Sequence, residues 1–360
     1  MKLDIYVIIP AYNAEEYIYA TVHSVLQQPY KKIKIVIVDD GSTDGTLKQS
    51  RQLETLYPQV CVLHRKNGGV SNARNMGIEY AVKTGADDAY IAFLDADDSW
   101  YPNYLTDAIV DELTAEQHDI YAFSMLNSDE PMQRFSAPAR YEQQTVPGGN
   151  TGIWKITNHF ASCLYHITLF RKWNIRFFSG YKYSEDKFFK LQCAFFAKSI
   201  QLRPELMYIY RENSTGAMKK SNELTSIEYY LPIINGWLES DQFINRWSNE
   251  TGVTTHCGYS LASIYFLDMS AAHLMRHGRA AEIKRTIKEH PHYPCFLEMR
   301  MEDVGEINYR NQQLLLHHPH LYAWKYRLRG MIENPLRAVS YWKPIRHFIN
   351  QRKYPLSQLP

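Results

Sequence analysis

The first hundred residues alternate between short runs of β-branched residues and helical patterns, and this alternation restricts the fold more than any other feature. Ile33 to Val38 is a nearly continuous β-branched run, which is typical of a strand buried on both faces. The runs that are predicted to be strands are residues 5–9, 33–38, 60–63 and 90–94. Strands that alternate with helices along a chain form a parallel sheet covered by helices. The sequence therefore predicts an α/β fold.

The segments between these runs are predicted to be helices. Asn13 is predicted to be the N-cap of the first helix, with Glu16 three residues later as its capping-box partner. Periodic apolar residues follow until Pro29 ends the segment. The next helix is expected to be capped by Thr43 or Asp44.

A cluster of polar residues follows each predicted strand. The clusters are residues 10–15, 39–46, 67–74 and 95–98. Parallel α/β sheets bind their ligands beyond the carboxyl ends of the strands. The four clusters are therefore expected to converge on one edge of the sheet and to form a binding site there.

The remainder of the chain reads differently. A length of 360 residues predicts two domains, at roughly 150 residues for each. We expect residues 1–220 to form the α/β domain and residues 221–360 to be mainly helical. The polar, Pro- and Gly-containing stretch 130–151 is predicted to be a loop or crossover near a ligand.

The charge of the chain is small overall but uneven. A net charge of +2 does not indicate a polyanionic binding partner, so no nucleic acid partner is expected. Residues 319–360 hold eight Lys or Arg and one acidic residue, Glu333. Between Leu321 and Lys353 the basic residues interleave with aromatic ones, which suits an anionic membrane surface. The alternatives are a basic helix packed on the body, or a contact between copies of this chain in a homo-oligomer.

Cysteine usage predicts the compartment. The five cysteines are odd in number and include no CxxC pair, so neither a zinc site nor a disulfide framework is indicated. We therefore expect a reducing, cytoplasmic location, with the tail on the inner face of the cell membrane. The N-terminal apolar run stops at Pro10 and is too short for a signal peptide. Residues 257–275 are predicted to be a buried helix rather than a membrane span, because Asp268 interrupts them.

Two carboxylate pairs could carry chemistry. Asp95 and Asp97 follow a predicted buried strand, and carboxylates in this arrangement can hold Mg²⁺ or Mn²⁺ together with substrate phosphates. The alternative is a turn that uses Asp for its backbone hydrogen bonds. Glu185 and Asp186 precede an aromatic helical pattern, where one of them could act as a general base. The alternative there is a helix N-terminus whose acidic residues complement the helix dipole.

Taken together, these motifs resemble those of the family 2 glycosyltransferases, which have the GT-A fold. The resemblance covers roughly residues 3–217 and says little about residues 221–360. The matching segments are Pro10-Ala11-Tyr12-Asn13-Ala14-Glu15, Val38-Asp39-Asp40-Gly41-Ser42-Thr43-Asp44, Gly68-Gly69-Val70-Ser71-Asn72-Ala73-Arg74-Asn75, Phe93-Leu94-Asp95-Ala96-Asp97-Asp98, Ser184-Glu185-Asp186-Lys187-Phe188-Phe189 and Tyr210-Arg211. Each motif is weak alone, but their order and spacing together are specific.

The resemblance implies roles in donor binding, mostly within residues 1–100. Pro10, Ala11 and Tyr12 would line the nucleobase pocket, with Tyr12 against the base. Asp40 would bind the base edge, and Arg74 would support the pocket. The other residues implied at the donor site are Glu15, Asn67, Gly68, Asp95, Ala96, Asp97 and Arg211.

The resemblance also implies the catalytic groups. Asp97 would be the principal ligand of a Mn²⁺ or Mg²⁺ ion, and Asp95 would meet the metal or the ribose. Asp186 would be the catalytic base, with Glu185 beside it on the acceptor side, within residues 101–220. Residues 157–170, with His159 and His166, lie where such enzymes shape the acceptor site. A packed or surface role is nevertheless the favoured interpretation for both histidines.

The predicted function is inverting transfer of a sugar from a nucleotide-sugar, most simply a UDP-sugar, to an acceptor hydroxyl. The acceptor would be a glycan or a lipid-linked oligosaccharide in surface polysaccharide synthesis. One alternative is a sugar-nucleotide pyrophosphorylase, which is disfavoured because no Gly-rich triphosphate loop bearing Lys or Arg lies near the N-terminus. Another is a non-catalytic subunit that binds a sugar nucleotide.

Overall fold

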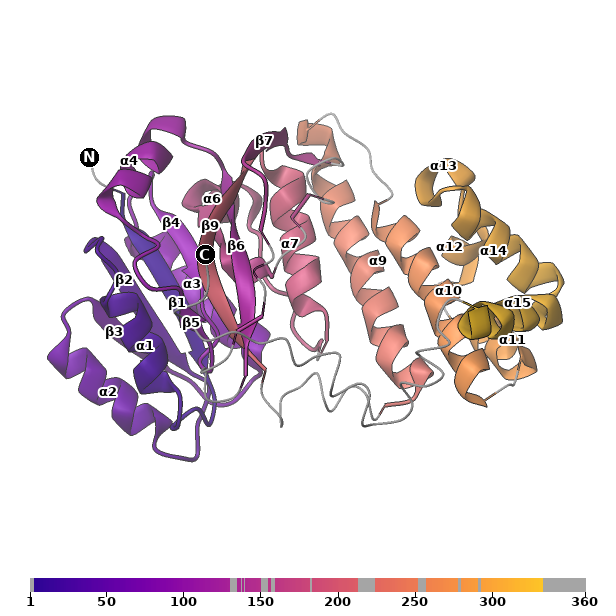
Figure 1. Ribbon diagram of the computed structural model, residues 1–360, viewed down its shortest axis with the longest axis horizontal. Helices are drawn as coiled ribbons and strands as arrows, with labels where there is room; N and C mark the ends of the chain where they lie inside the picture. The colour runs from indigo at the N-terminus through magenta and orange to yellow at the C-terminus, as the bar shows by residue number, and fades with distance from the viewer. Residues whose placement is uncertain are drawn as a thin grey trace. The chain divides into compact units, whose positions relative to one another are not determined.

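The computed structural model describes residues 3–129, 135–136, 138, 140–149, 155–156, 159–181, 183–212, 224–251, 257–277, 280–290 and 293–332. The chain divides into two compact units between residues 213 and 214. The first unit is α/β, and the described part of the second is helical (Figure 1). The predicted α/β class and the helical C-terminal region are confirmed. The predicted domain boundaries, including the division at residue 100, stay a prediction.

One nine-stranded sheet organises the first unit, in the order β3-β2-β1-β4-β8-β6-β9-β5, with β7 paired to β9. The strands are β1 (Ile5–Ala11), β2 (Ile33–Asp39), β3 (Val60–His64), β4 (Tyr90–Phe93), β5 (Ser99–Trp100), β6 (Ile120–Ser128), β7 (Gln144–Pro147), β8 (Cys163–His166) and β9 (Ser199–Arg211). Strands β3, β2, β1 and β4 run parallel. Strand β8 is antiparallel to β4 and to β6, so the other half of the sheet is mixed.

Helices cover the sheet and bury its central strands. They are α1 (Ile18–Leu26), α2 (Thr46–Leu56), α3 (Val70–Thr84), α4 (Asp107–Glu116), the 3₁₀ helix η1 (Phe160–Ser162), α6 (Ile167–Trp173) and α7 (Glu185–Phe196). Every residue of β1 is buried, as its apolar sequence predicts. A Cβ atom on Gly77 of α3 would lie 2.4 Å from Cγ2 of Ile8 in β1. The glycine therefore lets α3 pack closely against the central strand.

The four predicted strands are confirmed, but the predicted helix starts need correction. The first helix begins at Ile18 rather than next to Asn13, and its N-cap residue makes no side-chain capping bond. Asn13 instead has φ +49°, and its Oδ1 accepts a hydrogen bond from the Thr43 N–H at 2.8 Å. The second helix has Gly45 at its N-cap position, while Asp44 Oδ1 accepts from the Thr46 N–H at 3.0 Å. At the first helix, a contact between the loops at Asn13 and Thr43 thus replaces the predicted local cap.

The predicted loop 130–151 contains a strand, because residues 144–147 form β7 against β9. Several residues of that stretch, and the tail beyond residue 332, lie outside the described residues. The helices of the second unit are α9 (Ser226–Thr251), α10 (Cys257–His277), α11 (Ala280–Glu289), α12 (Tyr293–Leu297), α13 (Met301–Val304), α14 (Glu306–His317) and α15 (Pro319–Ile332). Among the helices described, none has the length and apolarity that a membrane crossing requires.

Candidate active site

The carboxyl ends of β1, β2 and β4 meet at one edge of the sheet, as predicted. Ala11 and Asp39, the last residues of β1 and β2, are partners in register. The N–H of Asp40 then donates to the carbonyl oxygen of Ala11 at 2.8 Å. Parallel pairing of β1 with β4 brings the segment at Asp95 to the same edge. Residues from three separate motifs therefore surround one region.

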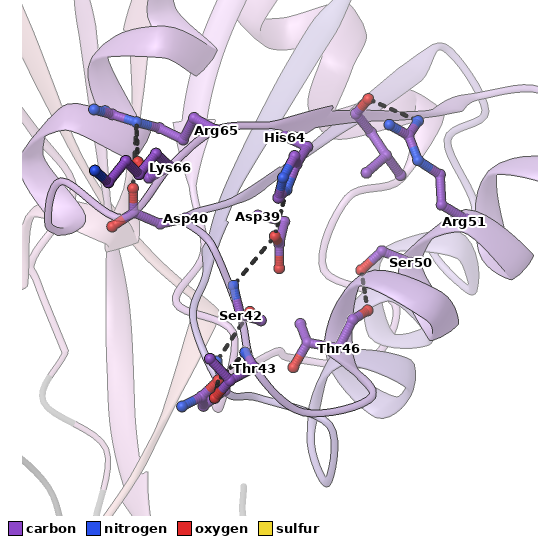
Figure 2. A network of polar contacts seen from close by, with 12 residues as sticks. Asp39, Asp40, Ser42, Thr43, Thr46, Ser50, Arg51, His64, Arg65 and Lys66 are labelled. Carbon is purple, nitrogen blue, oxygen red and sulfur yellow. Dashed lines mark hydrogen bonds and ion pairs between the residues drawn. The ribbon is translucent and has the colours of Figure 1, made fainter.

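The two neighbouring carboxylates at the end of β2, Asp39 and Asp40, hold different parts of this edge (Figure 2). Asp39 is completely buried, and its Oδ2 lies 2.8 Å from His64 Nδ1 and accepts from the Ser42 N–H at 3.3 Å. Asp40 Oδ2 accepts from the Gly69 N–H at 2.7 Å, and its Oδ1 lies 3.3 Å from Arg65 Nε. Asp39 thus anchors the turn before α2, and Asp40 anchors the loop before α3. The role of Asp40 at a base edge stays a prediction.

The loop that follows β1 is fastened to the start of α2. The Ala14 N–H donates to Thr46 Oγ1 at 2.8 Å, and Glu15 Oε2 accepts from the Gly45 N–H at 2.7 Å. Tyr12, in contrast, is 52% exposed. Its ring is therefore open to stack on a ligand, while Pro10 and Ala11 belong to the buried strand beneath it. The carboxylate of Glu15, which was predicted at the donor site, serves here to join two loops.

Glycines allow the loop 67–69 to approach β2. Gly41 has φ +74°, and a Cβ atom there would lie 2.7 Å from the backbone nitrogen of Asn67. Gly68 donates its N–H to Asp40 Oδ1 at 3.1 Å. Gly69 has φ +89° at the N-cap of α3, a conformation that L side chains rarely adopt. The glycine-rich motif thereby brings the start of α3 to the carboxyl edge of the parallel strands.

Arg74 contacts two separate elements, and one of its partners, Glu185, lies 111 residues from it in the sequence. Its Nη2 donates to Asp95 Oδ1 at 2.8 Å, and its Nη1 donates to Glu185 Oε1 at 3.1 Å. The guanidinium is 4% exposed and lies over the rings of Phe160 and Phe177, at 4.7 and 5.1 Å from their centroids. Arg74 therefore bridges the segment after β4 and the first turn of α7. The sequence predicted that Arg74 supports the base pocket, but it did not predict this bridge.

The bridge sets the proton affinities of its members. Burial alone would lower the pKa of Arg74, but Asp95 and Glu185 raise it above its ordinary value. Burial would raise the pKa of Asp95, yet the charge of Arg74, followed by that of His159, brings the pKa below its ordinary value. For Glu185 burial outweighs Arg74, so its pKa is raised.

The segment after β4 is held in place by hydrogen bonds to the end of β9, which include one from Tyr208, a residue that the sequence did not indicate. Asp98 is buried and accepts hydrogen bonds from the Tyr208 hydroxyl and from the Arg211 N–H. Burial, with Asp97 and Asp95 nearby, raises the pKa of Asp98 well above its ordinary value. The Nε of Arg211 donates to the carbonyl oxygen of Asp97 at 2.6 Å. Arg211 therefore sits beside the Asp95–Asp97 motif. Its predicted role at the donor site stays a prediction.

One further side chain holds this motif. Thr21 of α1 places its hydroxyl 2.8 Å from the carbonyl oxygens of both Ala96 and Asp98. Ala96, predicted at the donor site, is itself buried. Nothing in the sequence near Thr21 indicates this contact, because the partners lie 75 and 77 residues away.

No group of three or more His, Cys, Asp or Glu side chains in the described part of the chain is arranged to hold a metal ion. Mg²⁺ and similar hard cations, however, are commonly bound by one or two carboxylates and completed by substrate phosphates and water. Asp95 and Asp97, which are both partly exposed, have carboxylate oxygens that could serve in that mode. The residues present fit a cation shared with a substrate, and not an all-protein cage.

The second carboxylate pair lies on the first turn of α7, after Ser184 in a left-handed conformation. Asp186 is 28% exposed, and its Oδ2 lies 3.8 Å from His159 Nε2. The other histidine of this region, His166, caps α6 by accepting from the Thr168 N–H, which is a structural role. Glu185 and Asp186 thus occupy a helix N-terminus, as one of the two interpretations predicted, and the role of general base stays a prediction.

Comparison with known proteins agrees with this arrangement. Residues 6–177 match the model of a family described as glycosyl transferase family 2. This part of the chain is a family 2 glycosyltransferase domain. The match includes the motifs at Asp40, Arg74 and Asp97, and it ends shortly before the Glu185–Asp186 pair of α7.

Two bacterial relatives of the family 2 domain show how far the likeness extends. The chain is 31% identical over 238 residues to the uncharacterized glycosyltransferase EpsJ of Bacillus subtilis (strain 168), covering 62% of this chain and 63% of EpsJ. It is 39% identical over 109 residues to the UDP-Glc:alpha-D-GlcNAc-diphosphoundecaprenol beta-1,3-glucosyltransferase WfaP of Escherichia coli, covering 29% of this chain and 39% of WfaP. The chain therefore spans less than two thirds of either relative.

A solved structure establishes the fold of the family 2 domain. The structure of S. aureus TarS 1-349 in complex with UDP-GlcNAc matches with a TM-score of 0.55 at 19% identity, covering 86% of this chain and 90% of that one. At this level of identity the likeness concerns the fold. The predicted GT-A fold is confirmed.

Proposed function

We propose that this chain is an inverting glycosyltransferase that moves a sugar from a UDP-sugar to a hydroxyl group of a glycan or lipid-linked oligosaccharide. The observation that carries the proposal is the Arg74 bridge, because it joins the Asp95–Asp97 motif and the Glu185–Asp186 pair in one site. A single displacement at a sugar carbon needs a metal-binding motif for the leaving group and a carboxylate base for the attacking hydroxyl, both in one site.

On the donor side, the partly exposed Tyr12 ring would stack on the nucleobase, near the loop that Asp40 holds. Arg211, which is fixed beside Asp97, would meet the diphosphate as a charge-assisted donor. The name of WfaP specifies UDP-glucose as its donor, and this supports a UDP-sugar here. The family match favours a transferase over a pyrophosphorylase.

Metal dependence is part of the proposal. Asp97, with Asp95 beside it, would hold Mn²⁺ or Mg²⁺ together with the donor phosphates. A cation in this position supplies charge stabilisation to the departing diphosphate. Because Arg74 already neutralises part of the charge of Asp95, Asp97 is proposed as the principal ligand.

On the acceptor side, Asp186 would take the proton of the attacking hydroxyl. The new bond to the anomeric carbon forms opposite the bond to the leaving diphosphate, so one displacement inverts the configuration. Asp186 is 28% exposed and Glu185 is 14% exposed, so Asp186 has the carboxylate more accessible to an acceptor. The name of WfaP includes a diphosphoundecaprenol-linked sugar, which supports a lipid-linked acceptor.

A membrane surface is proposed to bind residues 321–353. In the described part of this segment, Leu321 and Trp324 are 54% and 63% exposed. Tyr322 is buried instead, and its hydroxyl donates to the carbonyl oxygen of Leu267 at 2.9 Å. Helix α15 therefore packs on α10 through one face, as the packed-helix alternative expects, and presents apolar side chains on another.

Replacement of the proposed base tests the function. Asp186→Asn should lower the turnover of UDP-glucose or UDP-N-acetylglucosamine by about 10²–10⁴-fold, because the amide cannot accept the proton. Donor binding, measured as protection against thermal unfolding, should persist. Asp107→Asn is the matched control, because Asp107 also lies in the first turn of a helix, α4, and is exposed. Turnover of the Asp186 variant within about threefold of wild type would place the base elsewhere.

A further inference from the structure

His159 lies between the aromatic core and the proposed base. Its ring contacts those of Phe160, Tyr208 and Tyr210, with centroid distances of 4.7, 5.6 and 6.2 Å. Its side chain is only 22% exposed, and its Nε2 lies 3.8 Å from Asp186 Oδ2. One ring nitrogen therefore faces the carboxylate, while the remainder of the imidazole is packed.

The surroundings determine which nitrogen of His159 carries the proton. Nδ1 is buried and has no hydrogen-bond partner among the described residues. A proton on Nδ1 would leave a buried donor unsatisfied, at a cost of about 1–3 kcal/mol. A proton on Nε2 instead faces the carboxylate of Asp186, whose Oδ2 is 3.8 Å away and is the acceptor nearest to hand. The favoured species is the neutral ring protonated at Nε2.

Burial supports this neutral species, because it lowers the pKa of His159. The charged groups that act on the ring are Asp95 and Asp186, which raise that pKa, and Arg74 and Lys190, which lower it. The balance lies below the ordinary value of histidine. A neutral ring protonated at Nε2 cannot accept the acceptor's proton through Nε2, so His159 is not the base.

We propose that His159 is a positioning residue for Asp186, whose Oδ2 it holds by donating a hydrogen bond from Nε2. The other oxygen, Oδ1, is then directed to the acceptor. This inference rests on the proposed function. The hydroxyl proton passes to Oδ1, the carbon–oxygen bond forms, and the electrons of the broken sugar–phosphate bond leave with the diphosphate. His159 keeps its own proton throughout. Hydrogen bonds of this kind are often long in unliganded sites and shorten when substrate binds.

Two substitutions separate the hydrogen bond from the packing. His159→Phe keeps an aromatic ring but removes the donor, and His159→Gln places an amide N–H near the position of Nε2. We expect His159→Phe to lower kcat by about tenfold to a hundredfold through misplacement of the carboxylate. The KM for UDP-glucose or UDP-N-acetylglucosamine should change by less than about twofold. His159→Gln should restore most of kcat, and the thermal stability of the two variants should be alike.

Non-additivity provides the decisive comparison. Because His159 acts through Asp186, His159→Phe should have no further effect in the Asp186→Asn background. A further loss there would overturn the inference, as would a His159→Phe variant with the kcat of wild type. An equal loss in the Phe and Gln variants would also overturn it, because it would show that the imidazole is needed for something other than its N–H.

A measurement without catalysis keeps the inference distinct from the proposed function. In NMR spectra of the protein with ¹⁵N-labelled histidine, the imidazole resonances of His159 are identified as those that are absent from the His159→Phe variant. We expect a protonated Nε2 and an unprotonated Nδ1, with the Nε2 shift altered in Asp186→Asn. A proton on Nδ1, or indifference to Asp186→Asn, would overturn the positioning role even if the protein transfers sugar. The expected spectrum would support it even if neither sugar nucleotide is turned over.

Discussion

Replacement of Arg74 by methionine should destabilise the α/β unit strongly. Methionine fills a similar volume between Phe160 and Phe177 but removes both charged hydrogen bonds. Asp95 and Glu185 would then lose the guanidinium that lies between them, and both carboxylates would be left without this ion-pair partner. Their side chains are 24% and 14% exposed, so water can restore only part of the lost interaction.

The magnitude follows from this burial. Removing one partner of a buried ion pair costs about 3–5 kcal/mol, because an uncompensated charge stays behind. Partial exposure of the two carboxylates places the expected loss near the lower end, at about 3 kcal/mol. For a folding unit of about 200 residues, each kcal/mol shifts Tm by about 2–4 °C. The expected decrease in Tm is therefore about 6–12 °C at neutral pH.

The pH dependence has a definite sign. The pKa of Asp95 is lowered in the folded state, so its contribution to stability is present above the ordinary Asp pKa and is lost as pH falls through the folded pKa. The pKa of Glu185 is raised, so its contribution is present below the ordinary Glu pKa and is lost as pH rises through the folded pKa. Without Arg74 both pKa values rise. The destabilisation of the Arg74→Met variant should therefore be largest at neutral pH. It should shrink toward about pH 4, where both carboxyl groups of the variant become protonated.

Thermal unfolding of the full-length protein at several pH values checks this reasoning. Arg51→Met is the matched control, because Arg51 pairs with Glu54 on the surface of α2, at 2.7 Å with 50% and 32% exposure. Such pairs contribute about 0–1 kcal/mol. Glu185→Gln in the Arg74→Met background should recover part of the loss, since it removes one stranded charge. The reasoning is refuted if the two arginine variants unfold alike, or if the loss at Arg74 does not depend on pH.

Three further outcomes are expected. Asp97→Ala should reduce sugar transfer by at least about 10²-fold while the fold persists, and full activity of the wild type in excess EDTA would contradict the metal role. Gly77→Ala should lower Tm, because overpacking against Ile8 costs about 1–3 kcal/mol and exceeds the gain in helix propensity of about 1 kcal/mol; a raised Tm would count against the close packing of α3 on β1. A chain ending at Ile332, which keeps the packed helix α15, should sediment less with anionic vesicles than the full chain, at about 1 kcal/mol for each basic residue removed; equal sedimentation of both would refute membrane binding by residues 333–353.

The local sequence determined the parallel half of the fold. Runs of β-branched residues such as Ile33 to Val38 are apolar on both faces, and only a strand covered on both sides satisfies them. The polar clusters that follow the strands could likewise be placed at one edge, because parallel strands end there together. Asp40 and Asp97 were predicted by this reasoning and by resemblance, and Arg211 by resemblance alone. The structure brings their motifs together, and their roles stay predictions.

Only the tertiary structure decided how those residues are connected. The insertion of antiparallel β8 between β4 and β6 brings the His159 region beside Asp95, and no periodicity in the sequence encodes that strand order. The Arg74–Glu185 contact spans 111 residues, so neither partner carries a local sign of the other. Asn13 shows the same limit at short range. Its sequence fits a helix cap, but its side chain satisfies the Thr43 N–H of a loop 30 residues away. Local patterns fix which residues are buried and where strands end, whereas the pairing of polar groups depends on which elements the chain brings together.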